Sequence, residues 1–422
     1  MKKTNISETV LKLLEKSYSP FHAVKNIEEE LLKAGFEALD EKETYRLKEG
    51  GSYFVKRNDS SILAFRLPKG NAPLSFHIAA AHTDSPTFKI KPNPLLKKGN
   101  LFLLNVEPYG GSLYSTWTDR PLSFAGRVVV KDGKEVSSHL LAIDEDLLQI
   151  PNLCIHMNRE ANNGFAYNPA KDLIPVFGFA EEGFDFNAYL QGKLGIKGEI
   201  LAHDLFLYNR DKPRLVGKEK EFLSAGRLDD LASAYTTLLG FLDGRSEEAV
   251  DVFVCFDNEE VGSLTKQGAN SDFLKNNLQR ILISLGKKDE MGEILARSFL
   301  LSVDNAHANH PNYPEVSDAT TCVQLGGGIV IKYNANQKYT SDAVSASFVK
   351  DIAKEAGVPV QEYTNRSDLR GGSTLGNISN SELSLTSCDI GLPQLAMHSS
   401  NEFLAIADLD YMVRLTAAYF AK

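Results

Sequence analysis

Four short apolar stretches of this chain each stop close to a histidine or an acidic residue. They cover residues 74–81, 250–256, 299–303 and 394–397, and they precede His82, the pair Glu259 and Glu260, Asp304, and His398. Runs of this length and composition are typical of strands that are covered on both faces. In an open α/β sheet, ligands and catalytic groups gather beyond the carboxyl ends of the strands. We therefore expect these side chains to meet in one site.

A sixth candidate side chain lies at the start of a helix. Apolar residues recur at Leu231, Tyr235, Leu238 and Leu242 with helical spacing, so Asp229 is predicted at or near the N-terminus of that helix. Strand-like and helix-like segments then alternate as far as a final helix predicted over residues 408–421. Such alternation predicts an α/β fold with a doubly wound, mostly parallel sheet and helices on both faces.

Residues 91–218 interrupt this alternation. They contain none of the six candidate side chains, and their short alternating segments, such as 101–106 and 127–130, are broken by glycine, proline and charge. A chain of 422 residues also exceeds one ordinary hydrophobic core. We expect an inserted, mostly β second domain at 91–218, which leaves a discontinuous catalytic domain formed by residues 1–90 and 219–422.

The charge and the apolar segments narrow the class of protein. A net charge of −9 without a basic stripe argues against nucleic acid and anionic membranes as partners. No segment approaches the roughly 20 apolar residues of a membrane span, and the N-terminal residues form an amphipathic pattern instead of a secretory signal. The four cysteines lie far apart, which predicts free, buried thiols in a reducing compartment. We expect a cytoplasmic protein.

The six candidate side chains favour a particular kind of metal site. Two imidazoles and four carboxylates suit Zn, Mn or Co, and no cysteines have the paired spacing of a structural zinc site. Six such groups exceed the needs of one tetrahedral ion, whereas two ions about 3.5 to 4 Å apart can share a carboxylate and a water. The sequence therefore predicts two divalent ions, which could be Zn, Mn or Co.

Two short pairs that include members of this set suggest different roles for the two residues of each pair. Adjacent carboxylates such as Glu259 and Glu260 point in different directions along extended backbone, so one can bind metal while the other takes a proton from metal-bound water. Asp84, two residues after His82, can orient the imidazole from behind. Neither pair is specific by itself, because a Glu-Glu pair is usually solvated surface charge.

Six motifs carry a resemblance to a known family. They are Ala80–Pro86, Tyr109–Gly111 followed by Ser115–Arg120, Arg227–Asp229, Asp257–Ser263, Asp304–His307 and Pro393–Ser399. In this order, and over nearly the whole chain, they resemble the M18 aspartyl aminopeptidase family. Its members are dizinc exopeptidases with a zinc-exopeptidase fold, and they remove N-terminal residues from peptides, acidic ones in the best-known members.

The resemblance implies a role for each candidate residue. His82, Glu260, Asp304 and His398 would be terminal metal ligands, Asp229 the bridging ligand, Glu259 the general base acting on a metal-bridged hydroxide, and Asp84 the partner of the first histidine. Substrate contacts would come from His307, from Lys332 on the acidic side chain, and from His156 delivered by a partner subunit. The inserted domain would build dimers that pack into a dodecamer. Without the resemblance, Lys332 is more simply the first exposed residue after the apolar run 329–331.

Two other functions fit the residues. A metal-dependent deacylase or a carboxypeptidase-type hydrolase could use the same scaffold and metal cluster, because fold and cluster do not fix the leaving group. A noncatalytic, self-assembling scaffold or cargo protein could retain the shape alone. The presence of every candidate ligand together with Glu259 speaks against this last possibility.

Overall fold

The computed structural model describes residues 6–70, 74–369, 371–372 and 374–422. The chain forms two compact units. The first contains Met1–Asp84, Pro213–Met397 and Glu402–Lys422, and the second contains Ser85–Lys212 and His398–Asn401. The insert was expected at residues 91–218. The second unit begins earlier, at Ser85, ends earlier, at Lys212, and also includes four residues from near the C-terminus.

The first unit is built on a nine-stranded sheet with the order β1-β2-β3-β13-β4-β14-β18-β16-β17. Its strands are β1 (Glu37–Leu39), β2 (Ser52–Arg57), β3 (Ser61–Arg66), β4 (Phe76–His82), β13 (Val250–Phe256), β14 (Phe299–Val303), β16 (Ile329–Tyr333), β17 (Val360–Thr364) and β18 (Thr386–Gly391). The central strand β4 pairs in parallel with β13 and β14, and β14 pairs in parallel with β18. β3 and β16 bring in the antiparallel pairs.

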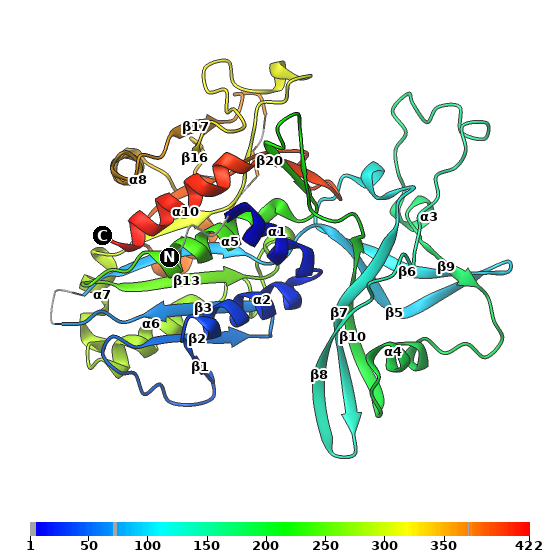
Figure 1. The fold of residues 1–422 in the computed structure, drawn as a ribbon, viewed down its shortest axis with the longest axis horizontal. Coiled ribbons are helices and arrows are strands. Elements are labelled where there is room, and N and C mark those ends of the chain that lie inside the picture. Colours follow the sequence, from blue (N-terminus) through cyan, green and yellow to red (C-terminus); the bar gives the residue numbers. More distant parts are fainter. Residues whose placement is uncertain (1–5, 71–73, 370, 373) are drawn as a thin grey trace. The chain divides into compact units, whose positions relative to one another are not determined.

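Helices cover both faces of this sheet. They are α1 (Ile6–Lys16), α2 (Pro20–Lys33), α5 (Leu228–Asp243), α6 (Phe273–Ser284), α7 (Met291–Ala296), α8 (Ala343–Ala356), α9 (Leu375–Leu383) and α10 (Ile406–Phe420). Because side chains alternate along a strand, Ala79 and Ala81 of β4 pack in a core with α1, α2, α5, α8 and α10, whereas Ile78 and Ala80 pack with α6, α7 and α9. Figure 1 shows α1, α2, α5 and α10 on one side of the strands. The doubly wound α/β fold is confirmed.

A smaller sheet of the first unit contains the strand that precedes His398. Its order is β11-β12-β20-β19-β15, with β11 (Arg214–Val216), β12 (Phe222–Ala225), β15 (Ala306–His307), β19 (Pro393–Leu395) and β20 (Glu402–Ala405). The apolar run 394–397 therefore does not supply a strand to the main sheet. Only Gln394 and Leu395 of that run are extended and paired, and they pair with β20 in this smaller sheet.

The second unit is mostly β, as expected of the insert. Its six-stranded antiparallel sheet has the order β8-β7-β10-β5-β6-β9, formed by β5 (Thr87–Lys98), β6 (Leu101–Tyr109), β7 (Leu122–Asp132), β8 (Glu135–Ala142), β9 (Val176–Phe179) and β10 (Glu199–Asn209). Two short helices, α3 (Pro169–Asp172) and α4 (Phe186–Leu194), accompany it. Trp117, the single tryptophan, is buried in this core against Phe88 and is therefore a packing residue.

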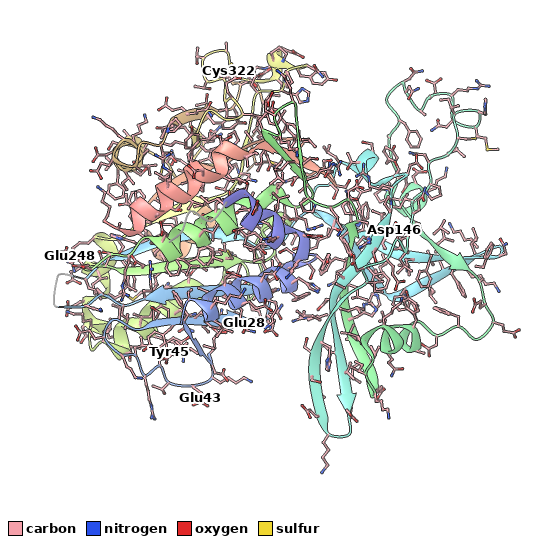
Figure 2. All side chains as sticks on the ribbon, viewed as in Figure 1. Glu28, Glu43, Tyr45, Asp146, Glu248 and Cys322 are labelled. Atoms are coloured by element: carbon pink, nitrogen blue, oxygen red, sulfur yellow. The ribbon has the colours of Figure 1, made fainter. Side chains whose placement is uncertain are left out.

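The cysteines were predicted free and buried, and this is right for only two of them. All four are free, but Cys255 and Cys388 are buried whereas Cys154 and Cys322 are exposed (Cys322 is labelled in Figure 2). Cys322 lies in the irregular segment before β16, which begins at Ile329. Among the described residues, no helix combines the length and the apolar character that crossing a membrane requires.

Candidate metal centre

His82 is the last residue of β4, and its ring is held from behind. Its Nδ1 lies 3.1 Å from the Asp84 carbonyl oxygen and 3.3 Å from the Asp84 carboxylate. A histidine that uses Nδ1 in this way presents Nε2 as its free ligand atom, an arrangement that metal-binding histidines commonly share. Both residues are almost fully buried. Asp84 thus lies behind the His82 ring, and its role in orienting that ring stays a prediction.

The Asp84 carboxylate also fixes the segment that carries the two glutamates. Its two oxygens accept the backbone N–H of Glu259 at 3.1 Å and the backbone N–H of Glu260 at 3.2 Å. The chain reaches this position because β13 lies in parallel register beside β4, with Phe256 opposite His82. One buried carboxylate therefore sets the position of a histidine and of both glutamates.

Three aspartates complete the cluster around His82. The neighbouring strand β14 ends at Val303, so Asp304 follows beside β4, and its carboxylate lies 3.9 Å from His82 Nε2. Asp229, near the start of α5, places a carboxylate oxygen 3.5 Å from the same nitrogen. Asp230 accepts the backbone N–H of His82 at 3.2 Å. The expected meeting of Asp229 with the ends of β4 and β14 is thus present.

This donor set fits divalent cations. Ligand atoms of His82, Asp229, Asp230 and Asp304, all buried, lie within 4.8 Å of one another, and those of His82, Glu259 and Glu260 form a second such group. Oδ1 of Asp230 is buried and has no hydrogen-bond partner among the described residues. Imidazole and carboxylate donors gathered in one site are typical ligands of Zn, Mn and Co.

The electrostatics of the cluster point in the same direction. Burial raises the pKa of Glu259 to about 8, and the nearby carboxylates of Asp304, Asp84 and Asp229 add to this, against the opposing effect of His82. Burial is likewise the main cause that raises the pKa of Asp230, Glu260 and Asp304. Burial opposes protonation of His82, but the hydrogen bonds of its ring with Asp229 and Asp84 raise its pKa well above the usual value. So many carboxylates require compensating positive charge.

Lys332 supplies one such positive charge, and the structure places it in the interior. It lies on β16, it is 2% exposed, and its Nζ donates to the carbonyl oxygen of Asp304 at 2.8 Å. The Asp304 carboxylate is 3.5 Å away. Burial opposes the charge, but the Asp304 carboxylate together with Tyr339, Asp389 and Asp230 outweighs this effect and raises the pKa of Lys332. The simple reading of Lys332 as an exposed residue after a strand is therefore wrong.

The remaining predicted site residues are three histidines, His307, His156 and His398. His307, on β15, is exposed, with its ring 6.0 Å from that of Tyr363. His156 lies in an exposed loop of the second unit. His398 also belongs to the second unit, where its Nδ1 lies 3.0 Å from the Gly111 carbonyl oxygen. The roles of these three histidines stay predictions.

Sequence reasoning missed Asp230. It follows Asp229 directly, it is fully buried, and it belongs to the same group of ligand atoms. The available signal was the pair of adjacent carboxylates at the start of a helix, the same feature that drew attention to Glu259 and Glu260. This signal is weak, because a second carboxylate in the first turn of a helix is ordinarily explained by the helix dipole.

Comparisons with known proteins point to one family. Residues 13–420 match the family model described as Aminopeptidase I zinc metalloprotease (M18). The chain is 43% identical to Probable M18 family aminopeptidase 2 of Clostridium novyi, with 99% of each chain covered, and 44% identical to the protein of that name from Clostridium acetobutylicum, with 97% of each covered. A chain in the cryo-EM structure of the Ape4 and Nbr1 complex is 34% identical with a TM-score of 0.94, over 99% of this chain and 85% of that one.

These matches decide between the three functions that the residues left open. They favour a hydrolase that acts as an aminopeptidase over a deacylase, a carboxypeptidase-type enzyme or a noncatalytic scaffold. They also agree with the resemblance drawn from the six motifs. The chain belongs to the M18 family of zinc metalloaminopeptidases.

Proposed function

We propose that this enzyme removes the N-terminal residue from peptides, preferentially an acidic residue, with two divalent ions at the cluster. The proposed ligands are His82, Asp229, Glu260, Asp304 and His398, with Asp229 as the bridge, and zinc is the first choice of metal, before Mn and Co. The observation that carries the proposal is the gathering of buried imidazole and carboxylate groups at the carboxyl ends of β4, β13 and β14.

Glu259 is the proposed general base. Bound divalent ions would polarise the scissile carbonyl, lower the pKa of a water and draw down the raised pKa values of the surrounding carboxylates. Glu259 then takes a proton from the attacking water and gives it to the departing amine. Its backbone is fixed by Asp84, so its side chain stays beside the ligands without having to serve as one.

A free α-amine is the chemical feature that should mark a substrate. In the proposed reaction, the amine of the N-terminal residue is held by a metal ion or a carboxylate of the cluster. We expect Nα-acetylated peptides to be cleaved at least about a hundredfold more slowly than their free counterparts, because acetylation removes the charge and the binding contact together. Product release from paired peptides by the zinc-loaded enzyme measures this. Equal rates on both sets would point to a deacylase or to another hydrolase.

Lys332 supports the acidic preference. It is a buried cation in contact with the proposed ligand Asp304, and its Nζ lies 5.2 Å from the Tyr339 ring centre. A lysine gives a charge-assisted bond to an acidic side chain, with less geometric selectivity than an arginine would have. The global charge of −9 offers no attraction for acidic peptides, so any preference must arise locally.

Replacing Lys332 with methionine tests this preference. Lys332→Met keeps the aliphatic stem and removes the charge, so kcat/KM should fall about tenfold more for N-terminal Asp and Glu substrates than for Leu, which corresponds to the loss of one charged hydrogen bond. Lys338→Met, on an exposed lysine of the same region, should leave the panel unchanged. An equal fall in kcat/KM across Asp, Glu, Leu and Lys substrates would mean that Lys332 only positions Asp304 and does not select the substrate.

We also propose that the second unit mediates self-association, with dimers that pack into a dodecamer as the family resemblance implies. The loop that carries His156 exposes Leu153, Ile155 and Met157, the last at 76%. Neighbouring exposed apolar side chains of this kind mark interaction surfaces more often than free loops. His156 would then act in the site of a partner subunit. We also propose that the protein is cytoplasmic and that it binds neither nucleic acid nor membranes.

A further inference from the structure

A buried carboxylate outside the proposed ligand set contacts the backbone of Asp229. Glu402 is the first residue of β20 and is 2% exposed. Its Oε2 accepts the backbone N–H of Asp229 at 3.0 Å, and its Oε1 lies 3.4 Å from the side-chain nitrogen of Gln394. Burying a carboxylate costs free energy unless hydrogen bonds replace its water, and here a backbone amide of the site provides one of them.

The same peptide group is also held on its carbonyl side. Asn305 donates from Nδ2 to the Leu228 carbonyl oxygen at 2.8 Å and to the Gln394 side-chain oxygen at 2.7 Å. Its Oδ1 accepts the Ser233 hydroxyl at 2.5 Å. The peptide between Leu228 and Asp229 is therefore bound at its C=O by Asn305 and at its N–H by Glu402.

This segment needs such partners because its backbone is not helical. Arg227 has a left-handed φ of 62°, and Asp229 has φ −83° and ψ 109°, so the regular bonds of α5 do not fix the Asp229 side chain. Asn305 follows Asp304 directly, and Lys332 donates to the Asp304 carbonyl oxygen. The hydrogen bonds therefore join the two backbone segments that carry Asp229 and Asp304.

We infer that Glu402, Gln394 and Asn305 form a peptide clamp that sets the direction of the Asp229 carboxylate and so tunes metal binding. This inference rests on the proposed function, in which Asp229 bridges the ions. The three residues are positioning residues, since they act on the metals through Asp229 and do not touch the reacting atoms. A bridging carboxylate must satisfy two ions at once, so a small rotation of its peptide weakens both bonds.

The test compares Zn²⁺ affinity and steady-state kinetics of matched variants. Glu402→Ala should bind Zn²⁺ about tenfold to a hundredfold more weakly than the wild type in competition with a chelator, the range found when partners of metal ligands are lost. At saturating zinc its kcat should fall while KM stays within about twofold. Glu402→Gln, which keeps an oxygen for the Asp229 N–H, should recover most of the affinity.

Asp251→Ala is the control for a purely structural loss. Asp251 is equally buried, accepts Arg66 and the Ser246 N–H, each at 3.1 Å, and lies at the opposite end of β13 from Glu259. It should lower thermal stability and leave Zn²⁺ affinity unchanged. If Glu402→Ala does not fold, Asn305→Leu, which is similar in volume, removes the bond to the Leu228 carbonyl and should weaken Zn²⁺ binding in the same way.

The possible outcomes separate this inference from the proposed function. Unchanged Zn²⁺ affinity in the folded clamp variants, or an equal loss in Asp251→Ala, overturns the clamp while leaving an active, zinc-binding wild type in place. A wild-type protein that binds no Zn²⁺ and cleaves no peptide would instead remove the proposed function itself.

Discussion

Glu259→Gln is expected to lower kcat by at least about a hundredfold while metal content stays at the wild-type level. Glutamine has the same shape but cannot take a proton from water. The backbone N–H of residue 259 still binds Asp84, so the segment should keep its position. The measurement is the turnover of a free N-terminal peptide by the zinc-loaded variant, together with elemental analysis of the same sample.

Glu260→Gln is the matched control for this prediction. Its backbone is held by the other oxygen of the same Asp84 carboxylate, so both variants disturb the local fold to the same extent. Because Glu260 is a proposed ligand, the Glu260→Gln protein should lose metal, whereas the Glu259→Gln protein should not. Full turnover in metal-replete Glu259→Gln would reject its role as general base, and the reverse pattern of metal loss would exchange the roles of the two glutamates.

The sequence predicted those parts of the site that follow a buried parallel strand. β4, β13 and β14 are apolar because helices cover both faces of the sheet. Each apolar run stops where its strand ends and the chain leaves the sheet. His82, Glu259 and Asp304 could therefore be recognised from the residues that precede them. The helical spacing of apolar residues after Asp229 likewise located the start of α5, because these residues are buried.

The sequence could not predict contacts that depend on the order of strands in space. Lys332 and Asp304 are 28 residues apart in the chain, and they meet only because β18 lies between β14 and β16 in the main sheet. Glu402 reaches Asp229 through a separate sheet that brings β20 beside β12. Neither strand order leaves a trace in local periodicity, so the contacts of Lys332 with Asp304 and of Glu402 with Asp229 could not be predicted.

Short apolar runs also gave a wrong prediction where a strand ends early and the chain passes into the other unit. The run 394–397 is apolar enough for a buried strand, yet its pairing ends at Leu395, and Ala396 adopts a left-handed φ of 56°. His398, with a φ of 66°, belongs to the second unit. Composition does not distinguish a strand end from a turn that leads into another compact unit.

Zinc is expected to stabilise the protein strongly, and His82→Ala should abolish most of this gain. The carboxylates of Asp229, Asp230, Asp304 and Glu260 crowd one site, and burial raises the pKa of Asp230, Asp304 and Glu260, so the folded protein disfavours the charges of these three groups. Divalent ions bound only to the folded state remove this cost and add about 4 kcal/mol of stability at a free concentration a thousandfold above Kd. Peptide hydrolysis should disappear on chelation and return with Zn²⁺.

The measurement is thermal unfolding of metal-free protein with and without added Zn²⁺, and His77→Gln is the control. His77 and His82 lie on the same strand, but His77 is near its start, with Nδ1 3.8 Å from the Asp251 carboxylate. His77→Gln should unfold at a lower temperature than the wild type and yet keep the full zinc-induced increase. His82→Ala should lose that increase together with activity, because Nε2 of His82 is the atom that Asp229 and Asp304 both face. An undiminished zinc effect in His82→Ala would place the metal elsewhere.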